Sequence, residues 1–448
     1  MRNISFILTI TKDYLEENIM KKEDFIKRYS KVIIKNNASL FLGAGFSMNS
    51  NLPSWEKLFS KCADDLHIPL EKSTDFSQIA QYYELKHGRH NLEALINEQI
   101  NIPLCPNKKL SDFLSLNFHN IWTTNFDKVI EKSLENNRIR FNVITADDNL
   151  EMVSESKVNV FKCGGDIVAR KDLFITRNDY EDYHSKRTTF LYFLKRELII
   201  NNFLFIGYSF KDGLIKHQLR SINSIIGNAP KHYAIVFREN SETFNYYIDD
   251  LEKNYNVNVI TVSDEDEFFQ LIDDLTNEVK KHYIYISGSV KKISGNETIL
   301  NLCKSLSKKI LSNEYFLVSA AGSHIGNYIF GTALKFLEEK GYDNIHDKLI
   351  IDPIPKFLPK DDITKHRLSL LSKCKSIIFI AGDKGTMEEY ELAKSLNLKM
   401  IPIPSTNGAA KEIFDEIKKD NPQLLSDLQS TEDIEEIISC VIDIIGNR

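Results

Sequence analysis

Four short polar segments, each placed directly after a run of apolar residues, carry the chemistry that this sequence suggests. They are Gly43–Ser47 (GAGFS), Thr123–Asp127 (TTNFD), Lys162–Asp166 (KCGGD) and Gly207–Ser209 (GYS). A short apolar run that ends in turn residues is typical of a buried strand. In an open parallel sheet, ligands bind where the carboxyl ends of the strands meet. The four segments are therefore candidates for a single binding site.

The first of these segments follows the apolar run Ser39–Leu42 and is predicted to be a tight turn, with a helical stretch that begins near Trp55. Gly43 and Gly45 would let the backbone approach a pyrophosphate, whose negative charge suits exposed N–H groups. Ordinary strand-to-helix turns also contain this short motif, so on its own it decides little. Its weight comes from the three segments downstream.

Further apolar runs predict the sheet that would hold these turns. In the first part of the chain, strands are expected at 39–42, 121–124, 141–144, 158–162, 202–206, 232–237 and 259–262. Helices are expected within 1–38, from 55 to about 118, and over 180–197. Strands that alternate with helices predict an α/β fold with a doubly wound, Rossmann-type parallel sheet. The long helical stretch after the first strand is interpreted as an insertion rather than a simple crossover.

A second Rossmann-like α/β unit is expected to begin near His282, after an acidic helix at 264–278. Its strands are predicted at 283–286, 316–319, 348–351, 376–380 and 399–403, with a helix at 299–311. We therefore divide the chain into two domains, 1–280 and 281–448.

The composition excludes several classes of protein. The chain has 448 residues, a net charge of −6, 42% hydrophobic residues and 27% charged residues, which is typical of a globular protein. The negative balance gives no general attraction to nucleic acid or to an anionic membrane. No apolar run approaches the roughly 18 residues of a spanning helix, and the N-terminal ISFILTI run is too short for a signal peptide. Six cysteines without a CxxC pair argue against structural zinc, so we expect a cytoplasmic protein without a metal.

The order of the four segments resembles the sirtuin-like NAD-binding family over roughly residues 35–265. The resemblance implies that NAD+ is the substrate, that the first turn cradles its pyrophosphate and that the last contacts the adenosine ribose. It implies that Asn125 is catalytic and positions a water at the nicotinamide ribose, while Asp127 supports the nicotinamide pocket. A capping role in a turn is the alternative for Asn125 and for Ser209. The NAD-binding positions implied are Gly43, Ala44, Gly45, Ser47, Asn125, Asp127, Gly207 and Ser209.

The third segment departs from this family. The family motif reads Lys-Leu-His-Gly-Asp, so Gly164 stands where the catalytic histidine is expected. Glycine can neither take a proton nor hydrogen-bond a ribose hydroxyl, so we expect the chain to be catalytically impaired. Deliberate substitution of a histidine is favoured over natural loss. His119 and His184 are the nearby candidates to replace it, although a lone histidine is more often structural.

The lack of CxxC pairs is a second departure, because deacylase members of the family carry a zinc module beside the groove for acyl-lysine. This difference weakens protein deacylation as the function and favours hydrolysis of NAD+ itself.

In the second domain, the turns at 287–289, 320–322 and 382–389 resemble the SLOG family of nucleotide-sensing domains. The last resembles the Gly-Gly-x-Gly-Thr-x-x-Glu loop of lysine-decarboxylase-like relatives, but Asp383 replaces the second glycine, so enzymatic activity is not expected there. Arg367 and Lys384 would bind phosphate, and Glu389 would meet a ribose hydroxyl. A solvated helix face is the alternative for Arg367. The ligand-binding positions implied are Gly288, Ser289, Gly322, Arg367, Lys384, Gly385, Thr386 and Glu389.

A sirtuin-like domain followed by a SLOG domain resembles the effectors of the Thoeris antiphage defence system over nearly the whole chain. The resemblance implies an NAD+ glycohydrolase that releases ADP-ribose and nicotinamide. It would be switched on when a cyclic ADP-ribose isomer, made by a companion TIR protein, binds the SLOG domain. It also implies a homo-oligomer, a tetramer or higher, without nucleic acid or membrane partners. Two alternatives stay open: a binding-only nucleotide sensor, which Gly164 makes plausible, and an NAD-dependent protein deacylase.

Overall fold

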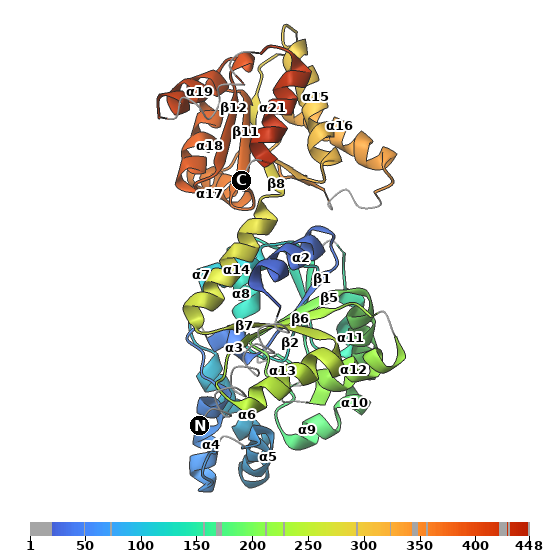
Figure 1. Ribbon diagram of the computed structural model, residues 1–448. Helices are drawn as coiled ribbons and strands as arrows, with labels where there is room; N and C mark the ends of the chain where they lie inside the picture. Colours follow the sequence, from blue (N-terminus) through green and yellow to red (C-terminus); the bar gives the residue numbers. More distant parts are fainter. Residues whose placement is uncertain are drawn as a thin grey trace, which may run out of the picture. The chain divides into compact units, whose positions relative to one another are not determined.

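The chain folds into two compact α/β units, Met1–Thr276 and Asn277–Arg448 (Figure 1). The computed structural model describes residues 20–48, 50–71, 74–155, 157–166, 173–210, 213–226, 229–292, 294–322, 324–342, 348–354, 357–420, 428 and 431–446. Within these residues, none of the helices combines the length and the apolar character that crossing a membrane requires.

The first unit is built on a seven-stranded parallel sheet with the order β3-β4-β2-β1-β5-β6-β7. Its strands are β1 (Ala38–Leu42), β2 (Asn120–Thr123), β3 (Phe141–Ile144), β4 (Val158–Lys162), β5 (Asn202–Ile206), β6 (His232–Phe237) and β7 (Val257–Val262). Strands β2 to β4 lie on one side of β1, and β5 to β7 lie on the other. The strand order therefore reverses at β1, which is where open α/β sheets form their ligand crevice.

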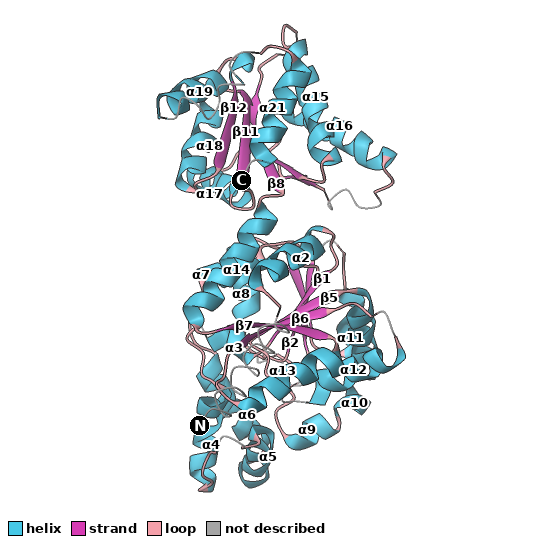
Figure 2. Cartoon of the chain, in the orientation of Figure 1, coloured by secondary structure: helices cyan, strands magenta, loops and turns pink. Residues whose placement is uncertain are grey.

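Helices cover this sheet and form the predicted insertion (Figure 2). They are α2 (Lys22–Ile34), α3 (Ala44–Met48), α4 (Trp55–Leu66), α5 (Phe76–His87), α6 (Arg89–Ile100), α7 (Lys108–Leu114), α8 (Val129–Asn136), α9 (Arg177–Glu181), α10 (Tyr183–Lys186), α11 (Thr188–Ile200), α12 (Gly213–Ile225), α13 (Glu242–Tyr255) and α14 (Glu265–Lys280), with a 3-10 helix at Asp147–Met152. The insertion is confirmed, because α4, α5, α6 and α7 all lie between β1 and β2. The predicted N-terminal helix is α2; residues 1–19 of that prediction lie outside the described residues.

Two local predictions differ from the structure. The helix expected over 180–197 is divided into α9, α10 and α11, and Arg187, between the last two, has a φ of −131° that is not helical. The segment expected as a tight turn after β1 forms the short helix α3, in which Phe46 and Ser47 are buried. Burial of these two side chains, which the local sequence does not reveal, favours a compact turn of helix over an exposed loop.

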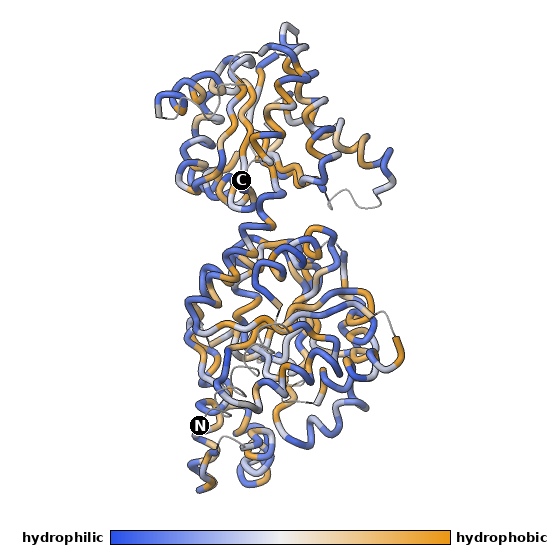
Figure 3. The backbone as a smooth tube through the Cα atoms, in the orientation of Figure 1, coloured by the Kyte–Doolittle hydropathy of each residue, from blue (hydrophilic) through white to orange (hydrophobic). Residues whose placement is uncertain are grey.

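The strands are apolar because the central ones are covered on both faces. All five residues of β1 are buried, and Figure 3 shows hydrophobic residues concentrated along the strands. Trp122 of β2 stacks on Phe161 of β4 with ring centroids 4.1 Å apart, and Phe190 of α11 packs edge-on against both rings. This aromatic packing fixes the strands whose carboxyl ends carry the polar segments.

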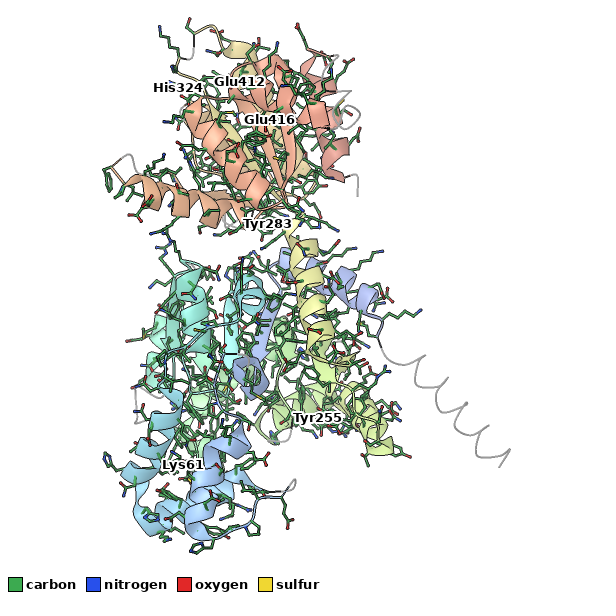
Figure 4. The ribbon with its side chains drawn as sticks, turned by 90° about the vertical axis from the view of Figure 1, so that its left-hand side faces the viewer. Lys61, Tyr255, Tyr283, His324, Glu412 and Glu416 are labelled. Carbon is green, nitrogen blue, oxygen red and sulfur yellow. The ribbon has the colours of Figure 1, made fainter. Side chains whose placement is uncertain are left out.

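The second unit contains a five-stranded parallel sheet with the order β10-β9-β8-β11-β12, so its strand order reverses at β8. Its strands are β8 (Tyr283–Ser289), β9 (Phe316–Ser319), β10 (Leu349–Ile351), β11 (Ser376–Ala381) and β12 (Lys399–Ile403). Its helices include α15 (Glu297–Ser312), α16 (Ile325–Glu339), α17 (Lys360–Leu371), α18 (Lys384–Ser395), α19 (Ala409–Asp420) and α21 (Ile434–Gly446), with a 3-10 helix at Pro404–Thr406. In Figure 4, Tyr283 marks the amino end of this sheet, and His324, which follows β9, lies at the opposite end.

Candidate functional site

Three glycines allow the turns after β1 and β5 to pack directly against each other. A Cβ atom on Gly43 would lie 2.4 Å from the carbonyl oxygen of Gly207, and one on Gly45 would lie 2.8 Å from the Gly207 Cα. The N–H groups of Gly43 and Gly45 donate to the carbonyls of Ile206 and Gly207, at 2.9 and 3.0 Å. Glycine is therefore required here for the approach of backbone to backbone, at the point where the strand order reverses.

This pairing corrects one part of the sequence interpretation. We expected exposed N–H groups on Gly43 and Gly45, but both donate to carbonyls at the end of β5 and in the turn that follows it. Ala44 is half-buried beside them, and Ser209 is exposed, with its carbonyl accepting the Tyr247 hydroxyl at 3.3 Å. The contacts of these positions with NAD+ stay predictions, and the donors to a pyrophosphate must be groups other than these two.

Asn125 lies at the centre of a buried hydrogen-bond network at the ends of β1 and β2. Its Nδ2 donates to the Gly43 carbonyl at 3.0 Å and to the Ser47 Oγ at 2.9 Å. Its backbone N–H donates to the Oγ1 of Thr123, whose hydroxyl in turn donates to the Leu42 carbonyl at 2.7 Å. Because both Nδ2 hydrogens are used, the remaining polar atom of the side chain is Oδ1, an acceptor. Asn125 is therefore oriented to accept a hydrogen bond from a water or a hydroxyl.

Ser47 connects this amide to the carboxyl group of Asp127. The Ser47 hydroxyl donates to that carboxylate, and the Val129 N–H donates to its Oδ1 at 2.9 Å. Ser47 is 3% exposed and Asp127 is 8% exposed. Burial raises the pKa of Asp127 above its ordinary value, against the opposing effect of these hydrogen bonds. The structure thus joins three residues that the sequence analysis assigned to one site.

Lys162, which the sequence analysis did not single out, ties β4 to the turn that carries Asp127. Its Nζ donates to the Asp127 carbonyl at 2.5 Å and pairs with Glu131 at 3.0 Å and with Asp166 at 2.7 Å. Burial would lower the pKa of Lys162, but the two carboxylates outweigh it and raise that pKa. The signal for this buried ion pair was a lysine at the end of a largely apolar strand. Lys128 also pairs with Asp166, at 2.7 Å.

Gly164 follows β4 in a backbone that leaves no room for a side chain. A Cβ atom there would lie 2.3 Å from the Thr124 carbonyl oxygen and 3.2 Å from the Phe126 ring. The Gly164 carbonyl accepts the N–H of Phe174 at 3.0 Å, which holds the turn in place. This backbone is fitted to glycine, and the deliberate substitution of a histidine stays a prediction from the sequence.

The two histidines proposed as replacements lie elsewhere. His119 directly precedes β2, so it lies at the amino end of the strand whose carboxyl end leads to Asn125. It is therefore excluded as the missing base. His184 is exposed on α10, where its ring lies 5.7 Å from that of His217 on α12.

The strand ends of the second unit show the same close packing. A Cβ atom on Gly288 would lie 2.0 Å from the Ile380 carbonyl oxygen, and one on Gly322 would lie 2.2 Å from the Gly288 carbonyl oxygen. The Gly382 N–H donates to the Ser289 carbonyl at 3.0 Å. The predicted ligand-binding positions at the ends of β8 and β9 are thus brought together.

Arg367 on α17 is already paired with carboxylates of α18. Its Nη1 pairs with Glu388, and its Nε lies 3.4 Å from the Glu389 Oε1. With its side chain only 12% exposed, the alternative of a solvated helix face is excluded. Glu389 accepts the hydroxyls of Tyr285 and Ser287, at 3.0 and 2.5 Å, and burial raises its pKa. The partners of Glu389 in this structure are hydroxyl groups, the kind of group that a ribose would also offer.

The N-terminus of α18 contains its own anion. The Asp383 Oδ1 accepts the Gly385 N–H at 3.2 Å, as an N-cap. The carboxylate takes the position that an external anion would otherwise favour. Thr386 is buried against Gly382, whereas Lys384 is exposed. Arg367 and Lys384 therefore remain the candidate cations for a phosphate.

Within the described ranges, no group of three or more His, Cys, Asp or Glu side chains is arranged to hold a metal ion. Two family models match the chain. The SIR2-like domain matches residues 119–260, and the Sir2- and TIR-associating SLOG family matches residues 267–447.

Curated relatives match over both units. NAD(+) hydrolase ThsA of Enterococcus faecium is 30% identical over 443 residues, which cover 89% of this chain and 91% of that protein. The chain belongs to the ThsA family. Two further ThsA proteins, from Cytobacillus dafuensis and from Bacillus cereus (strain MSX-D12), are 26% and 25% identical. The first match covers 97% of this chain and 98% of that relative, and the second covers 89% and 90%.

Membership of the ThsA family confirms the family resemblance predicted from the motifs. The family models and the two parallel sheets also confirm the predicted fold class, a SIR2-like unit followed by a SLOG unit.

Proposed function

We propose that this chain hydrolyses NAD+ to ADP-ribose and nicotinamide at the carboxyl edge of its first sheet, as an effector of antiphage defence. The observation that carries the proposal is the buried network of Ser47, Asn125 and Asp127 at the reversal of the strand order. The relatives named as NAD(+) hydrolases support the choice of substrate.

Hydrolysis of NAD+ requires few catalytic side chains. The bond between the ribose C1′ and the nicotinamide nitrogen breaks, and nicotinamide leaves as a neutral pyridine, so the leaving group needs no general acid. The attacking water must be oriented and must lose one proton. Asn125 offers its Oδ1 to that water, because both Nδ2 hydrogens are held by the Gly43 carbonyl and Ser47. Orientation of this kind lowers the entropic part of the barrier.

We further propose that catalysis in this chain is weakened at Gly164. A general base contributes about 10²–10⁴-fold to a rate, and glycine cannot act as one. We therefore expect the chain to hydrolyse NAD+ more slowly than a variant that has a histidine at position 164 and a backbone shifted to make room for it.

Control is assigned to the second unit. We propose that a cyclic ADP-ribose isomer, made by a companion TIR protein, binds at the ends of β8 and β9 beside Arg367 and Lys384. The pyrophosphate of the ligand suits these two cations. Binding can switch the enzyme only if the ligand prefers one arrangement of the protein over another. The proposed setting is a cytoplasmic homo-oligomer, a tetramer or higher, without nucleic acid or membrane partners.

The test is a nicotinamide-release assay on the full chain, with and without the cyclic isomer. The proposal predicts little release without the isomer and faster release when it is added. If the isomer binds and no nicotinamide appears, the chain is a binding-only sensor, the second candidate, which the backbone packing at Gly164 favours. Release that depends on an added acylated peptide would identify a deacylase.

A further inference from the structure

Hydrolysis of NAD+ needs a group that takes a proton from the attacking water. The family position for this group, residue 164, is a glycine whose Cβ direction is filled by the Thr124 carbonyl. Of the two nearby histidines, His119 lies at the far end of β2, and His184 is exposed on α10 with its ring beside that of His217. The side chains that contact Asn125 are a further set of candidates for the proton acceptor.

We propose that Asp127 is the proton acceptor in this chain and that Ser47 relays the proton to it. The inference rests on the proposed NAD+ hydrolysis and changes the role of both residues, from binding NAD+ to moving the proton. Asn125 would orient the water, Ser47 would pass its proton on, and the Asp127 carboxylate would hold it.

The hydrogen bonds around Ser47 are those of a relay. Its Oγ accepts the Asn125 Nδ2 at 2.9 Å and donates its own hydrogen to the Asp127 carboxylate. A hydroxyl has two acceptor lone pairs, so a second lone pair is left for the hydrogen of a water. In this proposal the attacking water is bonded to both Ser47 and the Asn125 Oδ1, two side chains that are in contact.

The proton and the electrons balance without any further reactant. The water oxygen forms a bond to the ribose C1′, and the bond between C1′ and the nicotinamide nitrogen breaks, with its electron pair leaving on nicotinamide. The water gives a proton to the Ser47 Oγ as the Ser47 hydrogen moves to Asp127. Asp127 then returns one proton to solvent. The sum is NAD+ and water giving ADP-ribose, nicotinamide and one proton.

The surroundings of Asp127 favour this role. Burial raises its pKa, and so does the charge of Glu131 on α8, whereas Lys162 on β4, the Ser47 hydroxyl and the Val129 N–H lower it. A carboxylate with a raised pKa is a stronger base than an exposed one. The charges nearby are largely paired with each other, since Lys162 and Lys128 contact Glu131 and Asp166. The Asp127 carboxylate is therefore hydrogen-bonded by the Ser47 hydroxyl and the Val129 N–H.

Asp127 also has a structural role, which the test must separate from catalysis. Its Oδ1 accepts the Val129 N–H at the start of α8, as a helix cap does. Asp127→Asn keeps the size of the side chain and an oxygen that can accept this N–H, and asparagine is as good a cap as aspartate. It removes the negative charge and with it the ability to take a proton.

The experiment measures nicotinamide release by the full chain from pH 5 to 9 with the cyclic isomer present, together with NAD+ binding by isothermal titration. We expect the kcat of the unaltered chain to rise with pH through one ionisation, since Asp127 must be unprotonated. Asp127→Asn should lower kcat by about 10²–10⁴-fold and abolish this ionisation, with the NAD+ affinity changed much less. Ser47→Ala should lower kcat and Ser47→Thr, which keeps the hydroxyl, should restore part of it.

Ser50→Ala is the matched control. Ser50 is 1% exposed, and its hydroxyl has no hydrogen-bond partner in the described part of the chain, so its removal should leave kcat and the pH profile unchanged. An Asp127→Asn variant that keeps kcat, or keeps the ionisation, overturns the inference while the proposed hydrolysis stands. A chain that binds NAD+ and the isomer but releases no nicotinamide at any pH overturns both.

Discussion

Glycines pack backbone against backbone at the carboxyl ends of both sheets of this chain. The polar side chains beside them differ between the two sheets. At the edge of the first sheet, Gly43 and Gly207 pack backbone against backbone, and Gly288 and Gly322 do the same at the edge of the second. Above the first pair lies a network of amide, hydroxyl and carboxyl groups centred on Asn125. Beside the second pair lies the charged cluster of Arg367, Glu388 and Glu389.

The difference suits two different tasks. The side chains around Asn125 use their hydrogen bonds on one another, so they are fixed in position and leave the Asn125 Oδ1 as an acceptor. Such preorganised groups act on a reacting water without having to move. Arg367, in contrast, is paired with Glu388 and lies close to Glu389. A phosphate that bound the Nη1 of Arg367 would have to compete with Glu388, so we expect binding there to be coupled to rearrangement.

The largest effect is expected at the first edge. Asn125→Ala removes the oriented acceptor and should lower nicotinamide release by about 10²–10³-fold, the usual loss for one preorganised group. Asn120→Ala, at the amino end of the same strand, is the control and should keep its kcat. Equal losses for the two variants would show that Asn125 acts on the fold of β2 and not on the reaction.

The next effect is expected at position 164, where any side chain must displace the Thr124 carbonyl. Gly164→Ala carries only the added Cβ, and overpacking of this kind costs about 1–3 kcal/mol of stability. Gly164→His should hydrolyse NAD+ faster than Gly164→Ala, by up to about 10²-fold if the imidazole regains its family role. Both are measured by nicotinamide release and thermal melting. Equal rates would place the family histidine at another position.

At the second edge, Arg367→Ala should weaken binding of the cyclic isomer by about 10–100-fold, the range for loss of a charge-assisted bond. NAD+ binding should be unchanged. Lys365→Ala is the control, since Lys365 lies on the same helix and is well exposed. Isothermal titration of each ligand into each variant decides the matter. A loss of isomer affinity in the control equal to that in Arg367→Ala would mean that general charge, and not Arg367, attracts the ligand.

The smallest effect tests the competition directly. Glu388→Gln removes the carboxylate paired with Arg367 and should tighten binding of the isomer by about 3–10-fold, because the phosphate no longer displaces a charged partner. Glu391→Gln, an exposed glutamate of the same helix that pairs with Lys394, should change the affinity less. Weaker binding of the isomer by Glu388→Gln would contradict the proposed competition between Glu388 and the phosphate for Arg367.

The sequence predicted most of the strands because buried parallel strands are continuous apolar runs bounded by turn residues. The bounds expected for β3, β4 and β5 agree with the structure, whereas β7 begins two residues early, at Val257, because the half-buried Asn258 interrupts the apolar run. The division of the helix after β4 was not visible, since a helical pattern continues across Arg187.

The site was predictable to the extent that its motifs are local. Asn125 and Asp127 are two residues apart, and their motif placed them before the fold was known. For Gly43, the sequence predicted contact with a pyrophosphate, whereas the structure shows contact with Gly207. This contact depends on β1 and β5 being neighbours, which a local pattern cannot reveal. The same holds for Lys162, whose partners come from α8 and from the turn after β4.

We propose that binding of the isomer beside Arg367 controls the binding of NAD+ beside Asn125. The most direct measurement is isothermal titration of NAD+ into the full-length Asn125→Ala variant, which should bind NAD+ with little turnover, with and without a saturating cyclic isomer. We expect tighter NAD+ binding when the isomer is present and, by linkage, an isomer affinity raised by the same factor when NAD+ is present. An NAD+ affinity that the bound isomer leaves unchanged would contradict it.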